Sequence, residues 1–571
     1  MFSDMVETDS KSTAQIVEDT KANDVLHEHT PNPDEEPTPH LHAKTFLIVF
    51  AVMVVYMAQL INLTGCGAYG RAVAASVGGA QDASWLVVCT VLMVAVFGPP
   101  VSQAADYWGR RWFLIGPTAC GVVGSIILAR ATSMPMAIAG EAILSLSYAA
   151  QPLLHAVASE VLTHRNRAAA QAAVNVGSGI GACIGLLAGS KLTAPLNGFR
   201  NFWYMTAGAY ALGVIVVYIF YTPPPREQQL KLTFKEKISK LDGIGFVLLC
   251  IGLTLFVMGL SWGENPYPWK NGHVLGPLLI GVSFLAAFVI YEWKFTCVGM
   301  VHHDLFSRDR NFAIALGCVF SEGLIFFAAN VYFPYQVGLL YEVDGTMLLC
   351  RFYCLHDLRH GPAIYCYRYK RLRAPMIFAF SCFLAFNICM ATTTLGSGTA
   401  VWGYPVLLGC ALSVALCVLV TAAQLSTPPH LIAITSGLMI SMRSIGGIVG
   451  VAIYTAVFNS RLADVLERNV AKAALPLGLP PTSLPLLIAD LSANNKTAIA
   501  TIPGITPLII QASSRTFLQS FVTSFRGVWI TASTFATAAL IASFFVYDPI
   551  NDFTQHIDAP AEREEDMYGE R

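Results

Sequence analysis

Long apolar blocks separated by short polar segments run along most of this 571-residue chain. A block of about 20 apolar residues is long enough to cross a bilayer as a helix, so each block predicts one membrane-spanning helix. Thirteen such blocks occur, at 44–64, 84–105, 112–131, 135–158, 169–190, 201–221, 241–261, 273–293, 312–336, 375–395, 402–423, 432–458 and 523–547. The expected fold class is therefore an all-α membrane protein.

Basic residues between the blocks predict the sidedness of the chain, because Lys and Arg concentrate in cytosolic loops. Basic segments follow the second, fourth, sixth and eighth blocks, whereas the intervening segments carry little charge. These basic segments are Arg110-Arg111, 164-HRNR-167, 226-REQQLKLTFKEKISK-240 and 308-RDR-310. Both termini are therefore expected in the cytosol, with the polar residues 1–43 as a disordered tail and 548–571 as a second tail.

One stretch interrupts the alternation of apolar blocks and short polar segments. It carries six Lys or Arg and spans 347–374, with the sequence MLLCRFYCLHDLRHGPAIYCYRYKRLRA. The topology on both sides requires a crossing here, because otherwise 368-RYKRLR-373 and every later loop would change sides. This additional helix would be the tenth of fourteen. It would also place 459–522 outside the cell, where Asn495 is a candidate glycosylation acceptor.

The composition of 347–374 opposes such a helix. Arg351, Asp357 and Arg359 occur together, and each charge at the bilayer centre costs about 2.5–3.5 kcal/mol. The pattern of the neighbouring sequence stops and resumes abruptly at the two ends of this stretch. We therefore interpret the stretch as a fault in the reading of the gene that replaces an atypical tenth helix. The alternative is a genuine re-entrant or cavity-lining segment, which is tolerated where it is buried in protein or faces water.

An internal repeat divides the chain. The segment 199-FRNFWYMTAGAYALGVIVVY-218 resembles 525-FRGVWITASTFATAALIASF-544, and each follows a Gly-rich block. The repeat predicts two related six-helix halves with two helices inserted between them. The expected division is 44–221 for the first half, 222–308 for the linker and inserted helices, and 309–547 for the second half with its outer loop.

Composition supports a membrane protein and excludes other classes. The chain is 55% hydrophobic and 12% charged, whereas soluble domains are about one quarter charged. The 14 cysteines are scattered without zinc spacing, and no Walker loop or enzyme constellation occurs. We therefore expect no metal, no other cofactor, no direct use of ATP, no enzymatic activity and no nucleic-acid partner.

The segment 98-GPPVSQAADYWGRRWFLIG-116 resembles the loop signature of the major facilitator superfamily. Asp106, Gly109, Arg110 and Arg111 match the signature, whereas Ser102 stands at the position of its leading glycine. The resemblance implies two six-helix halves with substrate bound between them. It also implies a charge pair that latches one of two conformations. The alternative is a plain positive-inside anchor.

The segment 160-EVLTHRNRAAAQ-171 repeats this latch arrangement after the fourth block. Its Glu160, Arg165 and Arg167 are also similar to charged positions of the superfamily. These three residues are therefore expected to act with the DYWGRR turn on the inner face.

Glycines at a spacing of four residues mark the fifth block. Gly181, Gly185 and Gly189 would allow close helix packing. The stretch resembles the antiporter signature of drug exporters, although Leu186 replaces its proline and Ser190 its last glycine. The resemblance implies export, and the alternative is tight packing without any directional meaning.

Glu141 stands in the fourth block at a position where drug exporters usually carry an arginine. A carboxylate in hydrocarbon tends to face a cavity or a partner, and burial disfavours its charged form. We predict that Glu141 carries a proton during transport. The alternative is a residue near the outer rim that pairs with Lys191 or Arg71.

Other polar residues inside the blocks are candidates for proton coupling or substrate binding. They are His155, Glu322, Asn330 and Arg443. Aromatic residues near Glu322 would suit a bulky amphipathic substrate. For each residue the alternative is a polar group satisfied between helices.

The whole pattern resembles the fungal fourteen-helix facilitators, and most of all the trichothecene efflux pump family, with siderophore transporters as close relatives. The resemblance implies proton-coupled export of a hydrophobic secondary metabolite, mycotoxin or drug by alternating access, with lipid, substrate and protons as partners. The expected location is the plasma membrane, with the vacuolar membrane as an alternative. The alternative functions are siderophore–iron import and a non-transporting receptor-like or inactive product.

Overall fold

The computed structural model describes residues 43–558, with gaps at 80–84, 194, 196–197, 225–228, 230–232, 264–266, 297–298, 302, 308, 342–359, 399, 493–495 and 500. Twelve of the described helices are long and apolar enough to cross a membrane. Within the described ranges no strand forms, and the β-pairing consists of one isolated bridge between Gly263 and Tyr267. The prediction of an all-α membrane protein is confirmed.

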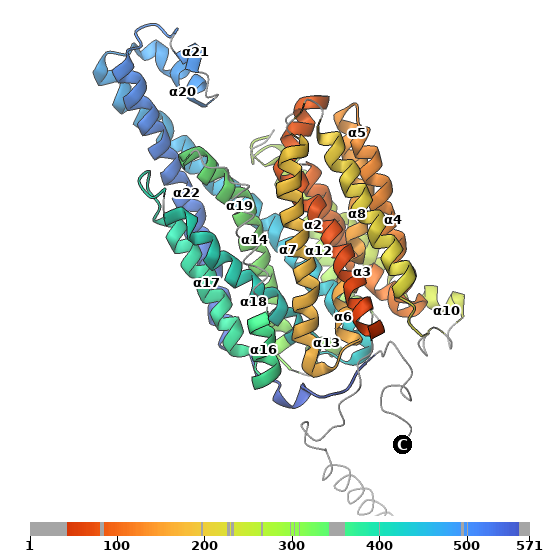
Figure 1. The fold of residues 1–571 in the computed structure, drawn as a ribbon. Coiled ribbons are helices and arrows are strands. Elements are labelled where there is room, and N and C mark those ends of the chain that lie inside the picture. The colour runs from red at the N-terminus through yellow and green to blue at the C-terminus, as the bar shows by residue number, and fades with distance from the viewer. Residues whose placement is uncertain are drawn as a thin grey trace, which may run out of the picture.

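Two helical bundles contain most of these helices (Figure 1). The first bundle comprises α2 (Ala43–Val77), α3 (Trp85–Trp108), α4 (Arg110–Ala129), α5 (Met134–Ser145), α6 (Gln151–Glu160), α7 (Arg167–Thr193) and α8 (Phe199–Phe220). The second comprises α14 (Asn311–Tyr341), α16 (His360–Tyr369), α17 (Arg373–Ala391), α18 (Tyr404–Leu425), α19 (Ile432–Ala474), α20 (Leu484–Ser492), α21 (Lys496–Ile499) and α22 (Pro507–Ser543). Between them in sequence lie α10 (Phe234–Ser239), α11 (Gly243–Trp262), α12 (Gly272–Lys294) and α13 (Asp304–Ser307).

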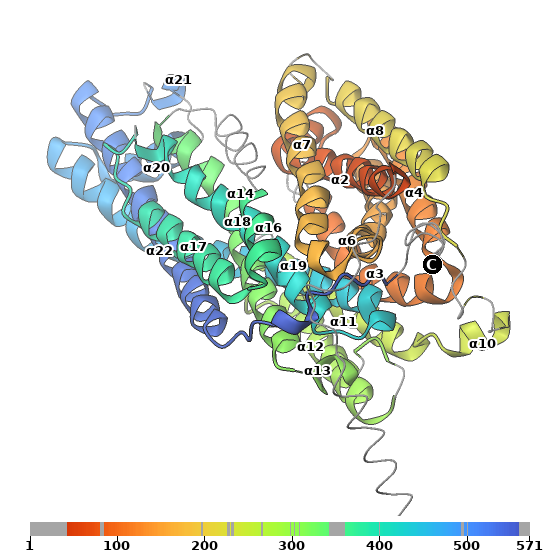
Figure 2. The same ribbon diagram turned by 60° about the horizontal axis from the view of Figure 1, so that its bottom comes forward.

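The bundles meet mainly where α3 packs against α19 and where α6 and α7 pack against α19 and α18. The inserted helix α11 lies over this seam and contacts both α3 and α19 (Figure 2). In Figure 1 the bundles converge at their lower ends and diverge toward the end that carries α20. We call the lower end, where α6 and α16 lie, the charged end because it holds Asp106 and Glu160.

Glycines allow the closest helix pairs in both bundles. A Cβ added at Gly181 of α7 would overlap the carbonyl oxygen of Met57 in α2. The second bundle repeats this packing, since a Cβ at Gly446 of α19 would overlap the carbonyl oxygen of Phe320 in α14. Equivalent pairs of helices therefore form equivalent backbone contacts in the two halves.

The fourth predicted span is not one helix. The structure divides 135–158 into α5, a 3₁₀ turn at Leu146–Ala150 (η2) and α6. Pro152 explains the break, because it has no N–H for the carbonyl of Tyr148 and its ring disfavours a continuous α-helix there. The turn leaves the carbonyl of Ser147 available, and it accepts a hydrogen bond of 2.9 Å from Gln59 Nε2.

Two helices extend beyond their predicted spans into 459–522. Helix α19 continues to Ala474, and α22 already begins at Pro507. An aromatic cluster joins α19 and α22 to α14 near the point where these extensions begin, and it comprises Tyr335, Phe458, Phe517, Phe521 and Phe525. Hydropathy marks only the apolar part of each helix, so the sequence pattern predicted a loop where the structure has largely helix.

The unusual stretch at 347–374 is described from residue 360 onward, and Arg351, Asp357 and Arg359 lie outside the described residues. Its described part forms α16, which packs against α7 and α18 with Ala363 and Cys366 buried. The hypothesis of a replaced tenth helix stays a prediction, as does the count of fourteen helices.

Candidate gate, cavity and buried carboxylates

A glycine turn positions the first charged group. Gly109 joins α3 to α4 with a φ of 97°, a conformation that disfavours residues with a side chain. The turn brings Arg110 Nη2 to 3.0 Å from Asp106 Oδ1. Arg110 also forms an ion pair with Glu160 at the end of α6. All three side chains are almost fully buried, so Arg110 ties together the charged ends of α3, α4 and α6.

Two other residues of the expected latch contact further helices. Arg111 donates a hydrogen bond of 2.8 Å to the carbonyl oxygen of Tyr218 on α8. The guanidinium of Arg165 lies 4.5 Å from the ring centroid of Tyr367 on α16. The expected latch residues thus have partners on several helices, and their role as a latch stays a prediction.

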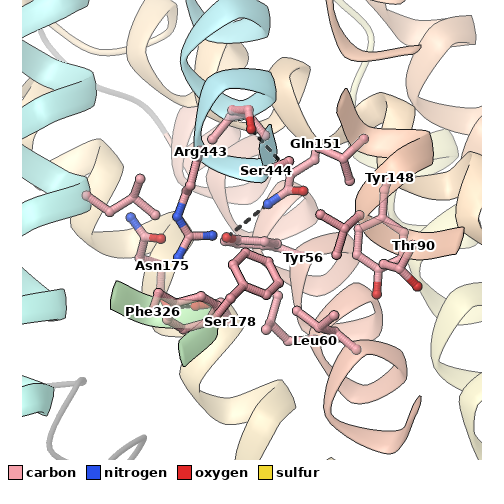
Figure 3. Close-up of a pocket in the computed structure, with 16 residues that line it drawn as sticks. Tyr56, Leu60, Thr90, Tyr148, Gln151, Asn175, Ser178, Phe326, Arg443 and Ser444 are labelled. Carbon is pink, nitrogen blue, oxygen red and sulfur yellow. Dashed lines mark hydrogen bonds between the residues drawn. The ribbon is translucent and has the colours of Figure 1, made fainter. Parts of the chain in front are cut away.

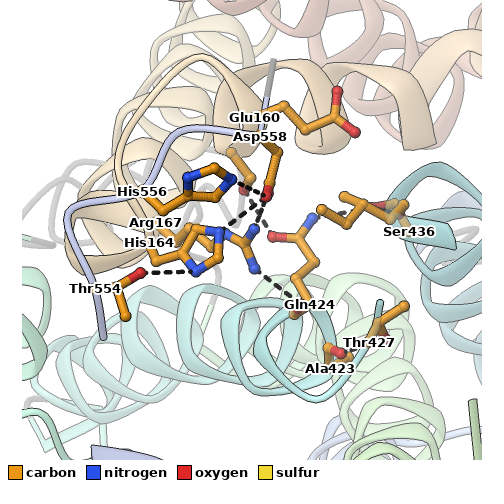
Figure 4. Close-up of polar contacts among 12 residues, drawn as sticks. Glu160, His164, Arg167, Ala423, Gln424, Thr427, Ser436, Thr554, His556 and Asp558 are labelled. Carbon is orange, nitrogen blue, oxygen red and sulfur yellow. Dashed lines mark hydrogen bonds and ion pairs between the residues drawn. The ribbon is translucent and has the colours of Figure 1, made fainter. Parts of the chain in front are cut away.

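Gln424 connects the two bundles at the charged end, and the sequence analysis missed it. Its main-chain carbonyl oxygen accepts a hydrogen bond of 2.9 Å from Arg167 Nη1, and its side-chain Oε1 accepts one of 2.7 Å from Ser159 Oγ. Its Nε2 donates to Ser436 Oγ at 2.9 Å within the second bundle. Because α6 and α7 are thus bonded to α18, the charged end is closed in this structure (Figure 4), and we call this group of contacts the gate. The only sequence signal was one polar residue beside an apolar block.

A cavity of about 40 Å³ lies between the bundles (Figure 3). Its lining is mostly apolar and aromatic, and the lining residues are Tyr56, Leu60, Leu63, Thr90, Val91, Val94, Tyr148, Gln151, Asn175, Ser178, Phe326, Phe327, Leu416, Ile440, Arg443 and Ser444. Cavities that bind drug-sized molecules have volumes of about 300–1,000 Å³. A bulky substrate would therefore require the bundles to move apart around this position.

Arg443 carries the charge that reaches this cavity. Its Nε and Nη2 lie 2.6 and 3.0 Å from the two carboxylate oxygens of Glu322, so the pair is bidentate. The guanidinium also lies 4.4 Å from the ring centroid of Phe326. Two candidate residues of the sequence analysis are thus joined across α14 and α19. A third, Asn330, donates to the carbonyl oxygen of Phe326 in its own helix at 2.8 Å.

Glu141 has a different environment. It is fully buried, and its Oε1 accepts hydrogen bonds from Asn62 Nδ2 at 2.9 Å, Thr90 Oγ1 at 2.9 Å and Ser145 Oγ at 3.2 Å. These neutral donors come from α2, α3 and α5. The complete burial argues against the alternative of a residue at the membrane rim.

A short chain of contacts connects Glu141 with the cavity. Thr90 contacts Glu141 and also lines the cavity. Tyr148 lines it too, and its hydroxyl lies 3.4 Å from Asn62 Nδ2. A change of charge at Glu141 would therefore alter hydrogen bonds in the cavity wall.

His155 lies on α6 between the cavity and the charged end. Its Nδ1 is 2.6 Å from Gln171 Oε1, and its ring meets that of Tyr56 edge-on at 5.5 Å. Tyr56 in turn accepts a hydrogen bond of 3.2 Å from Gln151 Nε2. His155 thus belongs to the wall between the gate and the cavity. Asn495, the candidate glycosylation acceptor, lies outside the described residues.

Comparison with known protein families decides what kind of molecule has this geometry. Residues 45–451 match the model of the Major Facilitator Superfamily. This chain belongs to the major facilitator superfamily. The protein is therefore a multi-pass membrane transporter, and the predictions of the family and of a non-enzymatic role are confirmed.

Three transporters of fungal species are similar to this facilitator. It is 24% identical over 471 residues to the MFS-type transporter ucsD of Acremonium sp, covering 80% of this chain and 76% of ucsD. It is 28% identical to the MFS-type efflux transporter pyiT of Pyricularia grisea, over 67% of this chain and 64% of pyiT. It is 21% identical to the trichothecene efflux pump TRI12 of Fusarium sporotrichioides, over 80% of this chain and 78% of TRI12. The predicted resemblance to this pump family is confirmed.

Solved structures support the fold. The facilitator is similar to the proton:xylose symporter XylE with a TM-score of 0.51 and 8% identity, over 87% of this chain and 96% of XylE. It is similar to the human organic anion transporter MFSD10 with a TM-score of 0.50 and 12% identity, over 87% of this chain and all of MFSD10. At these identities the likeness concerns the fold alone.

Proposed function

We propose that this facilitator exports a hydrophobic secondary metabolite, toxin or drug in exchange for protons, by alternating access across a fungal membrane. The observation that carries the proposal is the position of Glu141, a fully buried carboxylate that contacts the wall of the cavity between the bundles through Thr90. The similarity to the efflux transporter pyiT and the efflux pump TRI12 supports export as the direction of transport.

The cavity lining supports a substrate class. Arg443 is the one charged residue among the described residues that line it, and Glu322 neutralises that charge. The remaining polar groups are neutral, and Thr90, Gln151 and Asn175 are examples. Such a site favours an uncharged, largely apolar molecule that carries a few oxygen atoms as hydrogen-bond partners.

The proposed coupling follows from hydrogen-bond chemistry. An ionised Glu141 accepts three hydrogen bonds at Oε1, and its charge strengthens them. Protonation at Oε2 removes this charge while Oε1 still accepts, so the bonds from Asn62, Thr90 and Ser145 weaken and the cavity wall can change with them. The coupling thus links proton binding at Glu141 to the shape of the substrate site.

The proposed topology places the charged end in the cytosol, because it carries the basic segments around Arg110 and Arg165. The structure is closed at this end by the hydrogen bonds that join Ser159 and Arg167 to Gln424. It would therefore represent the state from which substrate leaves toward the opposite side of the membrane.

The proposal is tested in a yeast host that lacks its own drug pumps. Expression is expected to confer resistance to a trichothecene, and inside-out vesicles are expected to accumulate the labelled toxin only when a proton gradient is imposed. Uptake of a labelled ferric siderophore instead would contradict the proposal. So would an absence of both activities at a normal membrane level of the protein.

A further inference from the structure

The segment after α22 crosses the charged end and contacts both bundles (Figures 1 and 4). We call residues 547–558 the C-terminal strap. Its sequence, 547-YDPINDFTQHID-558, is polar and gave no hydropathy signal.

The strap begins with a firm attachment to the second bundle. Asn311, the first residue of α14, donates to the carbonyl oxygen of Tyr547 and accepts from its N–H, both at 2.8 Å. Asp548 Oδ1 accepts bonds of 2.8 and 2.9 Å from the N–H groups of Leu372 and Arg373. These donors lie at the start of α17, where a carboxylate is a favourable helix cap.

The strap then pairs with the first bundle. The N–H of His164 donates to the carbonyl oxygen of His556, and the N–H of Arg165 donates to that of Thr554, both at 3.0 Å. Phe553 is fully buried between these two attachments. The strap therefore lies against the α6–α7 connection with main-chain bonds and a buried aromatic anchor, which is more than a loose surface contact.

Asp558 ends the described part of the strap at a central point of the gate. Its side chain is only 3% exposed, forms an ion pair with Arg167 and lies 3.0 Å from His164 Nε2. Arg167 is the residue that also donates to Gln424 across the bundles. Asp558 thus supplies the counter-charge for the arginine that connects the two halves.

Electrostatics agree with this geometry. Burial alone would raise the pKa of the Asp558 carboxyl, but the hydrogen bond from His164 and the charge of Arg167 outweigh burial and lower its pKa. The other titratable group that faces it is His556, at 3.8 Å on the strap itself. Asp558 therefore stays ionised at neutral pH.

We propose that the C-terminal strap is a component of the gate, and that the facilitator opens at its charged end only after Asp558 leaves Arg167 and the strap separates from His164 and Arg165. The inference rests on the proposed alternating access. The strap is covalently part of the second bundle but bonded to the first, so the halves cannot part here while both sets of bonds remain.

Hydrogen–deuterium exchange of the full chain in lipid nanodiscs tests this inference without any substrate. Asp558→Asn is expected to raise exchange about tenfold or more at 159–171 and 420–436, because it leaves buried Arg167 without its counter-charge. Exchange in α20, at the opposite end, is expected to stay unchanged. Asp490→Asn on α20 is the matched control and is expected to leave 159–171 unaffected.

The other outcomes overturn the proposal. Unchanged exchange at 159–171 in Asp558→Asn would mean that the strap does not hold the gate, and a uniform increase along the chain would mean general destabilisation. If Asp558→Asn does not fold, a chain that ends at Phe553 provides the same comparison. Because hydrogen–deuterium exchange does not require transport, this test can be interpreted even if the export assay fails.

Discussion

Two buried carboxylates of this facilitator have opposite surroundings. Glu322 in the second bundle faces Arg443 in a bidentate ion pair, whereas Glu141 in the first bundle accepts hydrogen bonds from the neutral Asn62, Thr90 and Ser145. Both are fully buried. This difference makes Glu141 the better candidate for the proposed proton exchange. Removing the charge of Glu322 would leave the guanidinium of Arg443 without this counter-charge, whereas protonating Glu141 leaves no opposite charge uncompensated beside it.

The helical framework does not cause this difference. Both bundles contain a pair of helices in contact through glycines, with Gly181 facing Met57 in one and Gly446 facing Phe320 in the other. The halves therefore share their packing and differ in the polar residues placed upon it. We infer that the Glu322–Arg443 pair of the second bundle keeps its charges, whereas Glu141 of the first bundle can change its charge by binding a proton.

The largest loss of stability is expected from a substitution that breaks the Glu322–Arg443 ion pair. Arg443→Leu should destabilise the protein by about 3–5 kcal/mol, because Glu322 would remain buried without a counter-charge. The measurement is thermal unfolding in detergent. The double variant Glu322→Gln with Arg443→Leu is the control and should recover most of the loss. A single variant as stable as the parent would mean that the pair does not clamp α14 to α19.

Substitutions at two glycines, with a smaller expected loss of stability, test whether the helices of the two bundles pack equivalently. Gly181→Ala and Gly446→Ala should each cost about 1–3 kcal/mol, because the new Cβ must displace the backbone of a neighbouring helix. Gly208→Ala is the control, since no atom lies within 4 Å of a Cβ added there. The same unfolding measurement applies. If only one of the two variants loses stability, the halves differ in packing as well as in charge.

Asp558 adds a third carboxylate environment, outside the membrane. Its pKa in the closed gate lies below the ordinary value of 3.8, so its contribution to closure is complete above that value. The contribution is lost only as the pH falls through the lowered pKa. Gate opening, followed with a fluorophore attached at the charged end, should therefore not increase between pH 8 and pH 5. An increase in that range would show that a different group controls closure.

Much of the fold followed from the sequence because hydropathy and basic loops report directly on membrane crossings. The DYWGRR turn likewise identified Asp106 and Arg110 as partners, since they are four residues apart across a glycine turn. The sequence also selected Glu141, Glu322 and Arg443, because ionisable residues in apolar blocks are conspicuous.

The remaining features depend on contacts between distant segments. Glu322 and Arg443 are 121 residues apart, and only the helix rotations bring them together. Asp558 lies 391 residues from Arg167 in an unremarkable polar tail. Hydropathy and spacing do not encode such contacts. The break between α5 and α6 was missed for another reason, because hydropathy alone joined 135–158 into one span although Pro152 was a local signal for a break.

Proton coupling in Glu141→Gln is the most direct test of the proposal that Glu141 carries the proton exchanged for substrate. This substitution keeps the size of the side chain and should change the free energy of unfolding by only about 1 kcal/mol, since its partners are neutral. The measurement is proton flux, followed with an internal pH dye in proteoliposomes, during export of a substrate that the parent transports. If Glu141 carries the transported proton, substrate moves protons in the parent and moves none in Glu141→Gln. Substrate-driven proton flux of equal size in both proteins would contradict it.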